Sequence, residues 1–376
     1  MAISAAGIIF SNLNDNTLSR LTSDRTVAAI PFACRYRLVD FALSNLANAN
    51  ISNINIVANY NYRSLTEHIG SGKDWDLARR KGGINIISPY QTGYHAGTKM
   101  FATHMEALVN IKEYIDEFKE EYVILIDSDS VLNIDLEDVV RTHEESRASV
   151  TIVTSTIGEG YSSKHTRCML SSENGKVTDI SLGTVYNGKN NEVSLGILVV
   201  KTVHLRRIIE DAIAHDQYSL TSILLNNYKT DNFVTYNYKG YAASISSFLD
   251  YYRCSMELVK NEEARASLID RWESPIFTKV HNSSPVVYKS TAHVEGSMIA
   301  DECVIEGTVI NSVLFRGVKV EKGAVVKNCV LFRGTHVGKN ASLNCIVTDK
   351  DVYVSDGVQL SGNDNMPFYV QKFRKI

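Results

Sequence analysis

The stretch SNLNDNTLSRLTSDRTVAAIPFACRYRLVDFALSN, residues 11–45, connects a predicted buried strand to a predicted helix. Residues 5–10 are apolar, as in a buried strand, and residues 38–47 repeat apolar side chains at helical spacing. A polar loop that follows the first parallel strand is where α/β sheets bind phosphates, and it needs glycines and cations to do so. Between Ser11 and Ser19, however, the sequence has no glycine, lysine or arginine. We interpret this loop as the remains of a nucleotide-binding loop.

The region around this loop, residues 1–260, alternates apolar runs with helical patterns. In one of these patterns Phe101, His104 and Leu108 recur at helical spacing. Strands are expected at 53–58, 84–87, 122–126, 150–155 and 196–200, and helices at 63–69, 98–115, 138–145 and from 202 onward. This alternation predicts an α/β fold, with a mostly parallel, Rossmann-like sheet and helices on both faces.

The pattern changes in the last quarter of the chain. From 293 to 359, glycines separate short runs in which apolar residues recur six apart, as in the row Leu314, Val320, Val326 and Phe332. A hexapeptide period is typical of a parallel β-helix, in which each coil stacks on its neighbour. We therefore expect a β-helix domain at 289–376, joined to the α/β domain by a connector at 261–288. A β-sandwich of short strands is the alternative.

Length, charge and cysteine content limit the class of protein. The chain has 376 residues, which suits about two domains, and its net charge of −3 indicates neither a nucleic-acid nor a membrane partner. The six cysteines are scattered without a CxxC pair, which favours free thiols in a reducing compartment. The first residues lack the basic region of a signal peptide, and no apolar run reaches the ~20 residues of a membrane span. We expect a cytoplasmic protein.

Several strings along the chain resemble segments of one enzyme family. They are IPFACRYRLVDFALSN (30–45), HIGSGKDWDL (68–77), GYHAGT (93–98), YVILIDSD (122–129) and VSLGILVV (193–200). In this order and spacing they resemble the ADP-glucose pyrophosphorylases (glucose-1-phosphate adenylyltransferases), and most of all the GlgD-type regulatory subunits. The resemblance implies a nucleotidyltransferase-like α/β domain followed by a left-handed β-helix. The family makes ADP-glucose and pyrophosphate from ATP and glucose 1-phosphate, with Mg²⁺, for glycogen biosynthesis.

The resemblance also implies where the catalytic cations should lie, and each of these positions is degenerate. The family's phosphate loop, GGxGxR, falls on residues 12–17, where both leading glycines are missing and Thr17 replaces the catalytic arginine. Val27 stands at the position of a catalytic lysine, and Gly183 at that of the lysine that binds the sugar phosphate. Nucleotidyl transfer depends on such cations to neutralise the charge on the phosphates.

The implied metal and nucleotide contacts are only partly retained. The first metal carboxylate of the family matches Asp129, whereas the second falls on Ser244, which has no charged oxygen. Asp129 is thus either a residual metal ligand or a turn cap, and its neighbour Asp127 is expected to point to the other side of the strand. Gly97 and Thr98 either retain a contact with a purine or simply begin a helix.

Two arginines near the degenerate loop have a different character. Arg25 and Arg37 match positions that contribute, in the family, to an effector site that binds anions near the β-helix. Arginine is suited to bidentate contacts with phosphate. The alternative for both residues is a surface salt bridge.

These positions together predict a regulatory subunit of ADP-glucose pyrophosphorylase that is catalytically inactive or nearly so. It would join a catalytic paralogue, in a heterotetramer, and respond to a phosphorylated sugar effector. This chain is expected to require no cofactor itself, although the family reaction needs Mg²⁺. The alternatives are a slow adenylyltransferase that relies on Asp129, and a sensor that binds sugar phosphate or nucleotide without turnover.

Overall fold

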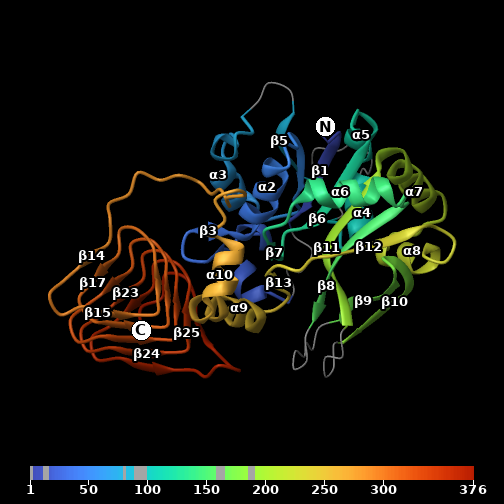
Figure 1. The fold of residues 1–376 in the computed structure, drawn as a ribbon. Coiled ribbons are helices and arrows are strands. Elements are labelled where there is room, and N and C mark those ends of the chain that lie inside the picture. The colour runs from blue at the N-terminus through green and yellow to red at the C-terminus, as the bar shows by residue number, and fades with distance from the viewer. Residues whose placement is uncertain (1–2, 12–16, 79–81, 89–99, 158–165, 185–190) are drawn as a thin grey trace.

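The computed structural model describes residues 3–11, 17–78, 82–88, 100–157, 166–184 and 191–376 (Figure 1). In this part of the chain an α/β domain is followed by a parallel β-helix, with helices α9 (Phe248–Lys260) and α10 (Glu262–Leu268) between the two (Figure 1). The predicted fold class is confirmed. In the described ranges, no helix combines the length and apolar character needed to cross a membrane.

The α/β domain is built on a nine-stranded sheet with the order β5-β4-β1-β6-β11-β8-β12-β10-β9. The strands are β1 (Ala5–Phe10), β4 (Asn53–Val57), β5 (Gly83–Ile87), β6 (Tyr122–Asp127), β8 (Val150–Ile157), β9 (Thr166–Glu173), β10 (Lys176–Thr184), β11 (Asn191–Lys201) and β12 (Phe233–Asn237). Neighbours among β5, β4, β1 and β6 are parallel, whereas β11 is antiparallel to both β6 and β8. The sheet is mixed because β8 to β11 follow one another without a crossover helix in the described residues.

Helices cover both faces of this sheet. They are α1 (Ser19–Thr22), α2 (Leu38–Asn48), α3 (Arg63–Ile69), α4 (His104–Asn110), α5 (Lys112–Asp116), α6 (Leu136–Glu145), α7 (Thr202–Ala214) and α8 (Leu220–Asn227), with 3₁₀ turns η1 (Val27–Ala29) and η2 (Lys73–Trp75). Because side chains alternate along β1, Ile8 and Phe10 pack with α4, α5, α7 and α8, while Ile9 packs with α2 and α6. The first strand therefore contributes to two apolar cores.

The helix predicted at 98–115 is shorter and interrupted. Its described part forms α4 and α5, and α4 begins only at His104. Thr103 sets this start, because its hydroxyl accepts a hydrogen bond from the Glu106 backbone while the Glu106 carboxylate accepts one from the Thr103 backbone. This capping box places His104 at the first position of the helix.

The C-terminal domain consists of three five-stranded parallel sheets. Its strands are β14 (Val287–Tyr288), β15 (His293–Glu295), β16 (Met298–Ile299), β17 (Val304–Ile305), β18 (Thr308–Ile310), β19 (Val313–Leu314), β20 (Lys319–Val320), β21 (Val325–Lys327), β22 (Val330–Leu331), β23 (His336–Val337), β24 (Ser342–Asn344), β25 (Ile346–Thr348), β26 (Tyr353–Val354), β27 (Gln359–Ser361) and β28 (Phe368–Val370). Buried Ile305, Val320, Val337 and Val354 lie one above another in successive coils. This parallel pairing confirms the β-helix and excludes the β-sandwich, whose strands would be antiparallel.

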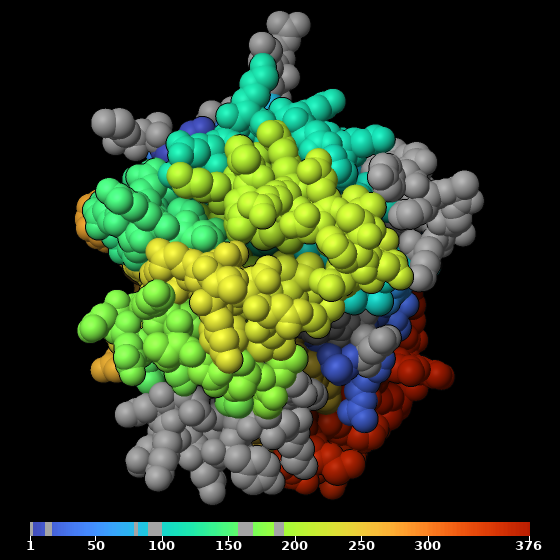
Figure 2. All heavy atoms as spheres, turned by 90° about the vertical axis from the view of Figure 1, so that its right-hand side faces the viewer, coloured from blue at the N-terminus to red at the C-terminus, as the bar shows by residue number. Residues whose placement is uncertain are grey.

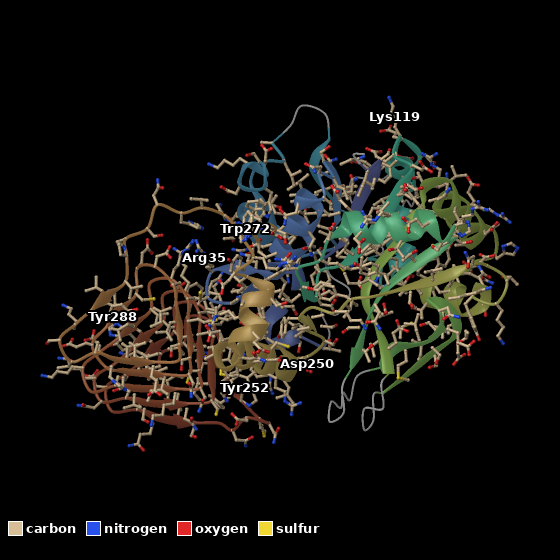
Figure 3. All side chains as sticks on the ribbon, viewed as in Figure 1. Arg35, Lys119, Asp250, Tyr252, Trp272 and Tyr288 are labelled. Carbon is tan, nitrogen blue, oxygen red and sulfur yellow. The ribbon has the colours of Figure 1, made fainter. Side chains whose placement is uncertain are left out.

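The two domains share one apolar core. Tyr251, Tyr252 and Phe41 of the α/β domain pack in one cluster with Phe332 and Val330 of the β-helix. Tyr252, labelled in Figure 3, is one of the residues of α9 that bridge the domains: its hydroxyl donates a hydrogen bond of 2.9 Å to the carbonyl of Asn328. In the space-filling view, an N-terminal segment (blue) lies against the C-terminal end of the β-helix (red), as shown in Figure 2. The domains are therefore packed together rather than loosely tethered.

Candidate functional site

A cleft of about 560 Å³ lies beside the carboxyl ends of β1 and β6. Thr17, Asp129 and Ser244 all line it, so the structure brings two degenerate family positions together with the carboxylate that matches the family. The predicted nucleotide contacts Gly97 and Thr98, like most of the degenerate loop, lie outside the described residues. The cleft thus stands where the resemblance places the nucleotidyl-transfer site.

Two carboxylates, not one, face the cleft. Strand β6 ends at Asp127, a turn holds Asp129, and β7 (Ser130–Leu132) follows. The expectation that Asp127 points to the other side of the strand was wrong, because Asp127 at the end of β6 and Asp129 in the following turn both line the cleft. A bulge in β11 makes room for the Asp127 side chain: a Cβ at Gly196, whose φ is +69°, would lie 2.7 Å from Asp127 Oδ2. Only glycine fits at this position.

His104 is a cleft residue that sequence reasoning missed. Its Nε2 lies 2.7 Å from Asp127 Oδ1, and its ring packs edge-on against Phe10. Burial alone would lower the pKa of His104, but the carboxylates of Asp127 and Asp129 outweigh this effect and raise it. In the sequence, His104 looked like part of the buried stripe of a helix. No local signal marks it, because its partner is 23 positions away.

The donor atoms at the expected metal position do not fit the implied Mg²⁺ site. Ser244, on β13 (Ala242–Ser244), lies opposite Ser130 of β7, so hydroxyls stand where a second carboxylate would be needed. Asp127 is already hydrogen-bonded to His104, and Asp129 is 6% exposed. The described residues contain no cluster of three or more His, Cys, Asp or Glu side chains suited to a metal ion. Asp129 remains as a single matching carboxylate.

The positions of the two missing lysines have different surroundings. Val27, in η1, is 1% exposed and belongs to the apolar cluster that includes Leu21 and Phe32. Gly183 lies on β10, where a Cβ would come within 2.8 Å of the end of the Met169 side chain. Neither position lines the cleft. At Val27, where the family has a lysine, the side chain is part of the apolar core instead.

Arg25, which the resemblance assigns to an anion-binding effector site near the β-helix, pairs with a carboxylate of the protein itself in this structure. Its side chain is fully buried, and Nη2 donates hydrogen bonds of 2.7 and 2.9 Å to the two carboxylate oxygens of Asp349 in the β-helix. Asp349 also accepts a hydrogen bond from the Tyr369 hydroxyl, and Asp24 pairs with both Arg25 and Lys372. The role of Arg25 in this arrangement is therefore structural: it joins the two domains.

Arg37 lies at the same domain boundary but is only partly buried. Its Nη1 donates hydrogen bonds to the Ser64 carbonyl and hydroxyl at 2.6 and 2.9 Å. Burial, reinforced by the nearby Arg25, lowers the pKa of Arg37 to about 10 despite Asp40. Burial together with Arg25 and Arg37 likewise lowers the pKa of Lys350 to about 8. Arg25 and Arg37 thus raise the cost of charging Lys350, which a bound anion would relieve.

Comparison with known families and proteins agrees with this arrangement. Residues 14–180 match the nucleotidyl transfer family model described as "Nucleotidyl transferase", and residues 282–371 match the model "GlmU-like, C-terminal hexapeptide". The glycogen biosynthesis protein GlgD of Bacillus subtilis (strain 168) is 34% identical over 373 residues, which cover 97% of this chain and 95% of that protein. The protein of the same name from Geobacillus stearothermophilus is 34% identical over 329 residues, covering 85% of this chain and 82% of that protein.

The similarity therefore extends through both domains, and the hexapeptide match coincides with the coils of the β-helix. The chain belongs to the GlgD family, whose fold is that of the ADP-glucose pyrophosphorylases: a nucleotidyl transferase domain followed by a left-handed hexapeptide β-helix.

Proposed function

We propose that this protein is a regulatory subunit of an ADP-glucose pyrophosphorylase in glycogen biosynthesis, acting in the cytoplasm with little or no catalytic activity of its own. It would assemble with a catalytic paralogue, as a heterotetramer, and change that subunit's rate or effector response. The observation that carries this proposal is the charge of the cleft. Its described lining includes Asp127 and Asp129 but no lysine or arginine.

The missing lysines and arginines matter because nucleotidyl transfer depends on cations as well as on carboxylates that hold Mg²⁺. Attack of a sugar phosphate on the α-phosphorus of ATP brings two anionic groups together, and enzymes stabilise that transition state with cations and metal ions. Removing a single such stabilising group commonly lowers the rate by about 10²–10³. Several of these groups are missing at once, at the positions of Thr17, Val27, Gly183 and Ser244.

The rest of the fold favours a role other than catalysis. The sheet, the β-helix and the domain interface are complete in the described residues, and the names of the relatives connect the family with glycogen biosynthesis. A subunit with this fold can act by favouring one arrangement of a shared interface. Coupling of this kind is typically about 1–3 kcal/mol, which changes an apparent affinity by about 5- to 150-fold.

The first test is reconstitution. The full chain is mixed with its catalytic paralogue, the mixture is separated by size exclusion, and initial rates are measured at fixed catalytic-subunit concentration. We expect co-elution, with a changed rate, substrate affinity or effector response. Separate elution, or co-elution with all three quantities unchanged, would contradict the regulatory role.

The second test addresses the rival function of a slow enzyme, which the retained Asp129 favours. The purified chain alone is assayed with ATP, glucose 1-phosphate and Mg²⁺. Turnover is expected far below ~10 s⁻¹, the median for enzymes. Ser244→Asp should leave turnover low, because Thr17 and the other missing cations are not restored. Turnover near the median in the unmodified chain would establish the enzyme instead.

The third test concerns the effector. Among the predicted effector contacts we now favour Arg37, with Lys350 as its neighbour, over Arg25, which is buried against Asp349. In the reconstituted complex, Arg37→Ala should weaken the response to phosphorylated sugars and inorganic phosphate while assembly persists. Arg63→Ala is the matched control, because Arg63 lies on the adjacent helix α3 and is exposed. An equal loss in both variants would remove Arg37 from the effector site.

A further inference from the structure

Trp272 is the most exposed large apolar side chain in the described part of the chain, at 85%. It lies in the short segment that follows α10 and is labelled in Figure 3. The other tryptophan of the chain, Trp75, is 2% exposed and packs in an apolar core. A single exposed apolar side chain needs no explanation by itself. The surroundings of Trp272 therefore decide what its exposure means.

The loop that presents Trp272 is fixed at both ends by one buried amide. Asn133 Nδ2 donates hydrogen bonds to the carbonyls of Leu268 and Ser274, at 3.1 and 2.8 Å, and Asn133 Oδ1 accepts one of 2.7 Å from the Ser274 hydroxyl. Between these ends, Arg271 Nη1 donates a hydrogen bond of 2.9 Å to the Asn133 carbonyl. A ligand that contacts Trp272 therefore meets a loop that is already ordered, which lowers the entropic cost of binding.

A groove of about 540 Å³ adjoins this loop, and Arg271 and the residues at the end of β12 line it. Its volume is typical of small-molecule sites, which span about 300–1,000 Å³. The hydroxyls of two half-buried groove residues, Tyr236 and Tyr238, donate hydrogen bonds to Asp138 and to the Asn133 carbonyl. Aromatic rings held in this way supply contact area at a low cost in conformational entropy. No described residue lines both this groove and the cleft, so the two sites are separate.

The charges on the loop and along the groove are mixed. The ionic side chains there include Asp135, Lys239, Asp270, Arg271 and Glu273. Single-stranded nucleic acid also stacks on aromatic rings, but it needs a positively charged groove, so carboxylates on both sides of Trp272 disfavour it. An uncharged ligand rich in hydroxyl groups suits both signs of charge, because carboxylates accept hydrogen bonds from hydroxyls and cations donate to them.

A pyranose ring combines such hydroxyls with an apolar C–H face, which would remove the Trp272 ring from water by packing on it. We propose that the Trp272 loop and the adjoining groove bind a neutral polysaccharide, an α-glucan of the glycogen type. The choice of an α-glucan among neutral polysaccharides rests on the proposed role in glycogen biosynthesis. Bound in this way, the subunit would keep its catalytic partner close to the polymer for which ADP-glucose is made.

Binding is measured on the full chain without its catalytic partner, so a negative result leaves the reconstitution test of the regulatory role untouched. Maltoheptaose is titrated by calorimetry, and migration is compared in native gels with and without glycogen. We expect a heat of binding and retardation by glycogen. The emission of Trp272 should shift to shorter wavelength as the ring leaves water, and buried Trp75 should contribute no shift.

Substitution of Trp272 tests whether the exposed ring carries the binding. Trp272→Ala should weaken maltoheptaose binding at least about tenfold, or about 1.4 kcal/mol, and abolish retardation by glycogen. Trp272→Phe should keep most of the affinity, because an aromatic face remains. Both variants should fold, since the side chain is exposed. Tyr288→Ala is the matched control: Tyr288, also labelled in Figure 3, is 56% exposed on β14 of the β-helix, and its loss should not change binding.

Four results would overturn the glucan site. They are no maltoheptaose binding by the unmodified chain, unchanged binding by Trp272→Ala, an equal loss in Tyr288→Ala, and binding of an oligouridylate as tight as that of maltoheptaose. If the unmodified chain binds no glucan and Trp272→Ala no longer co-elutes with the catalytic paralogue, the Trp272 loop is a protein interface instead.

Discussion

In the cleft, Asp127 and Asp129 face a cavity and share a partly exposed histidine, whereas at the domain interface the Arg25 guanidinium lies buried on the Asp349 carboxylate. Both regions sit at positions where the family resemblance implies phosphate binding. In the cleft the two carboxylates line an open space, with His104 as the hydrogen-bonded partner of Asp127. At the interface the charges neutralise each other, so they hold the domains together. The partner of a charged residue, more than its type, therefore decides its role.

The largest expected effect is at the interface. Arg25→Met leaves Asp349, which is 1% exposed, without its cation, and breaking a buried pair in this way typically costs about 3–5 kcal/mol. Urea denaturation should show this loss in the free energy of unfolding. Arg25→Met combined with Asp349→Asn should recover much of it, because Asn still accepts from Tyr369 without an unpaired charge. A loss below about 1 kcal/mol for the single variant would show that the pair does not hold the domains.

The next effect contrasts two positions at which a cation can be restored. Val27→Lys puts an ammonium into the apolar cluster around Leu21 and Phe32, and should lower the free energy of unfolding by about 3 kcal/mol or more. Thr17→Lys, at an exposed cleft position, should change it by no more than about 0.5 kcal/mol. Thermal and urea unfolding of both variants provide the measurement. Similar losses for the two would mean that Val27 is less tightly packed than the structure indicates.

The smallest effect concerns the Asp127–His104 pair and depends on pH. Because the folded protein raises the pKa of His104 above its usual 6.5, the folded state binds the proton more tightly than the unfolded state. This contribution to stability is complete below pH 6.5 and disappears as the pH rises through the folded-state pKa. Asp127→Asn should therefore cost about 1 kcal/mol near pH 5.5 and less near pH 8.5.

The control measures the effect of Asp127→Asn on the free energy of unfolding at both pH values in a His104→Gln background. It separates the contribution of the Asp127–His104 pair from that of other titrating groups. Without the imidazole, Asp127→Asn should have the same effect at low and high pH. If the cost of Asp127→Asn in the otherwise unmodified chain grew toward high pH, the assigned direction of the His104 pKa shift would be contradicted.

Most of the fold was predictable from the sequence because its signals are local. Apolar runs such as 122–126 mark buried strands, and the repeated spacing that includes Leu314 and Val320 marks the β-helix. The helix expected at 98–115 was less well predicted, because Thr103 and Glu106 set its start through a capping box within the apolar pattern. The antiparallel direction of β11 also has no local signal, since periodicity does not specify which strands become neighbours.

The sequence alone determined the family, the two-domain order and the degenerate chemistry at Thr17, Gly183 and Ser244, because each is a matter of residue type at a fixed place in the chain. Only the tertiary structure decided how the remaining charged groups are used. Arg25 meets Asp349 from 324 positions away, and His104 meets Asp127 at the carboxyl end of β6. Such pairs arise from the packing of distant elements, and burial then determines whether a charge joins two domains or faces a ligand.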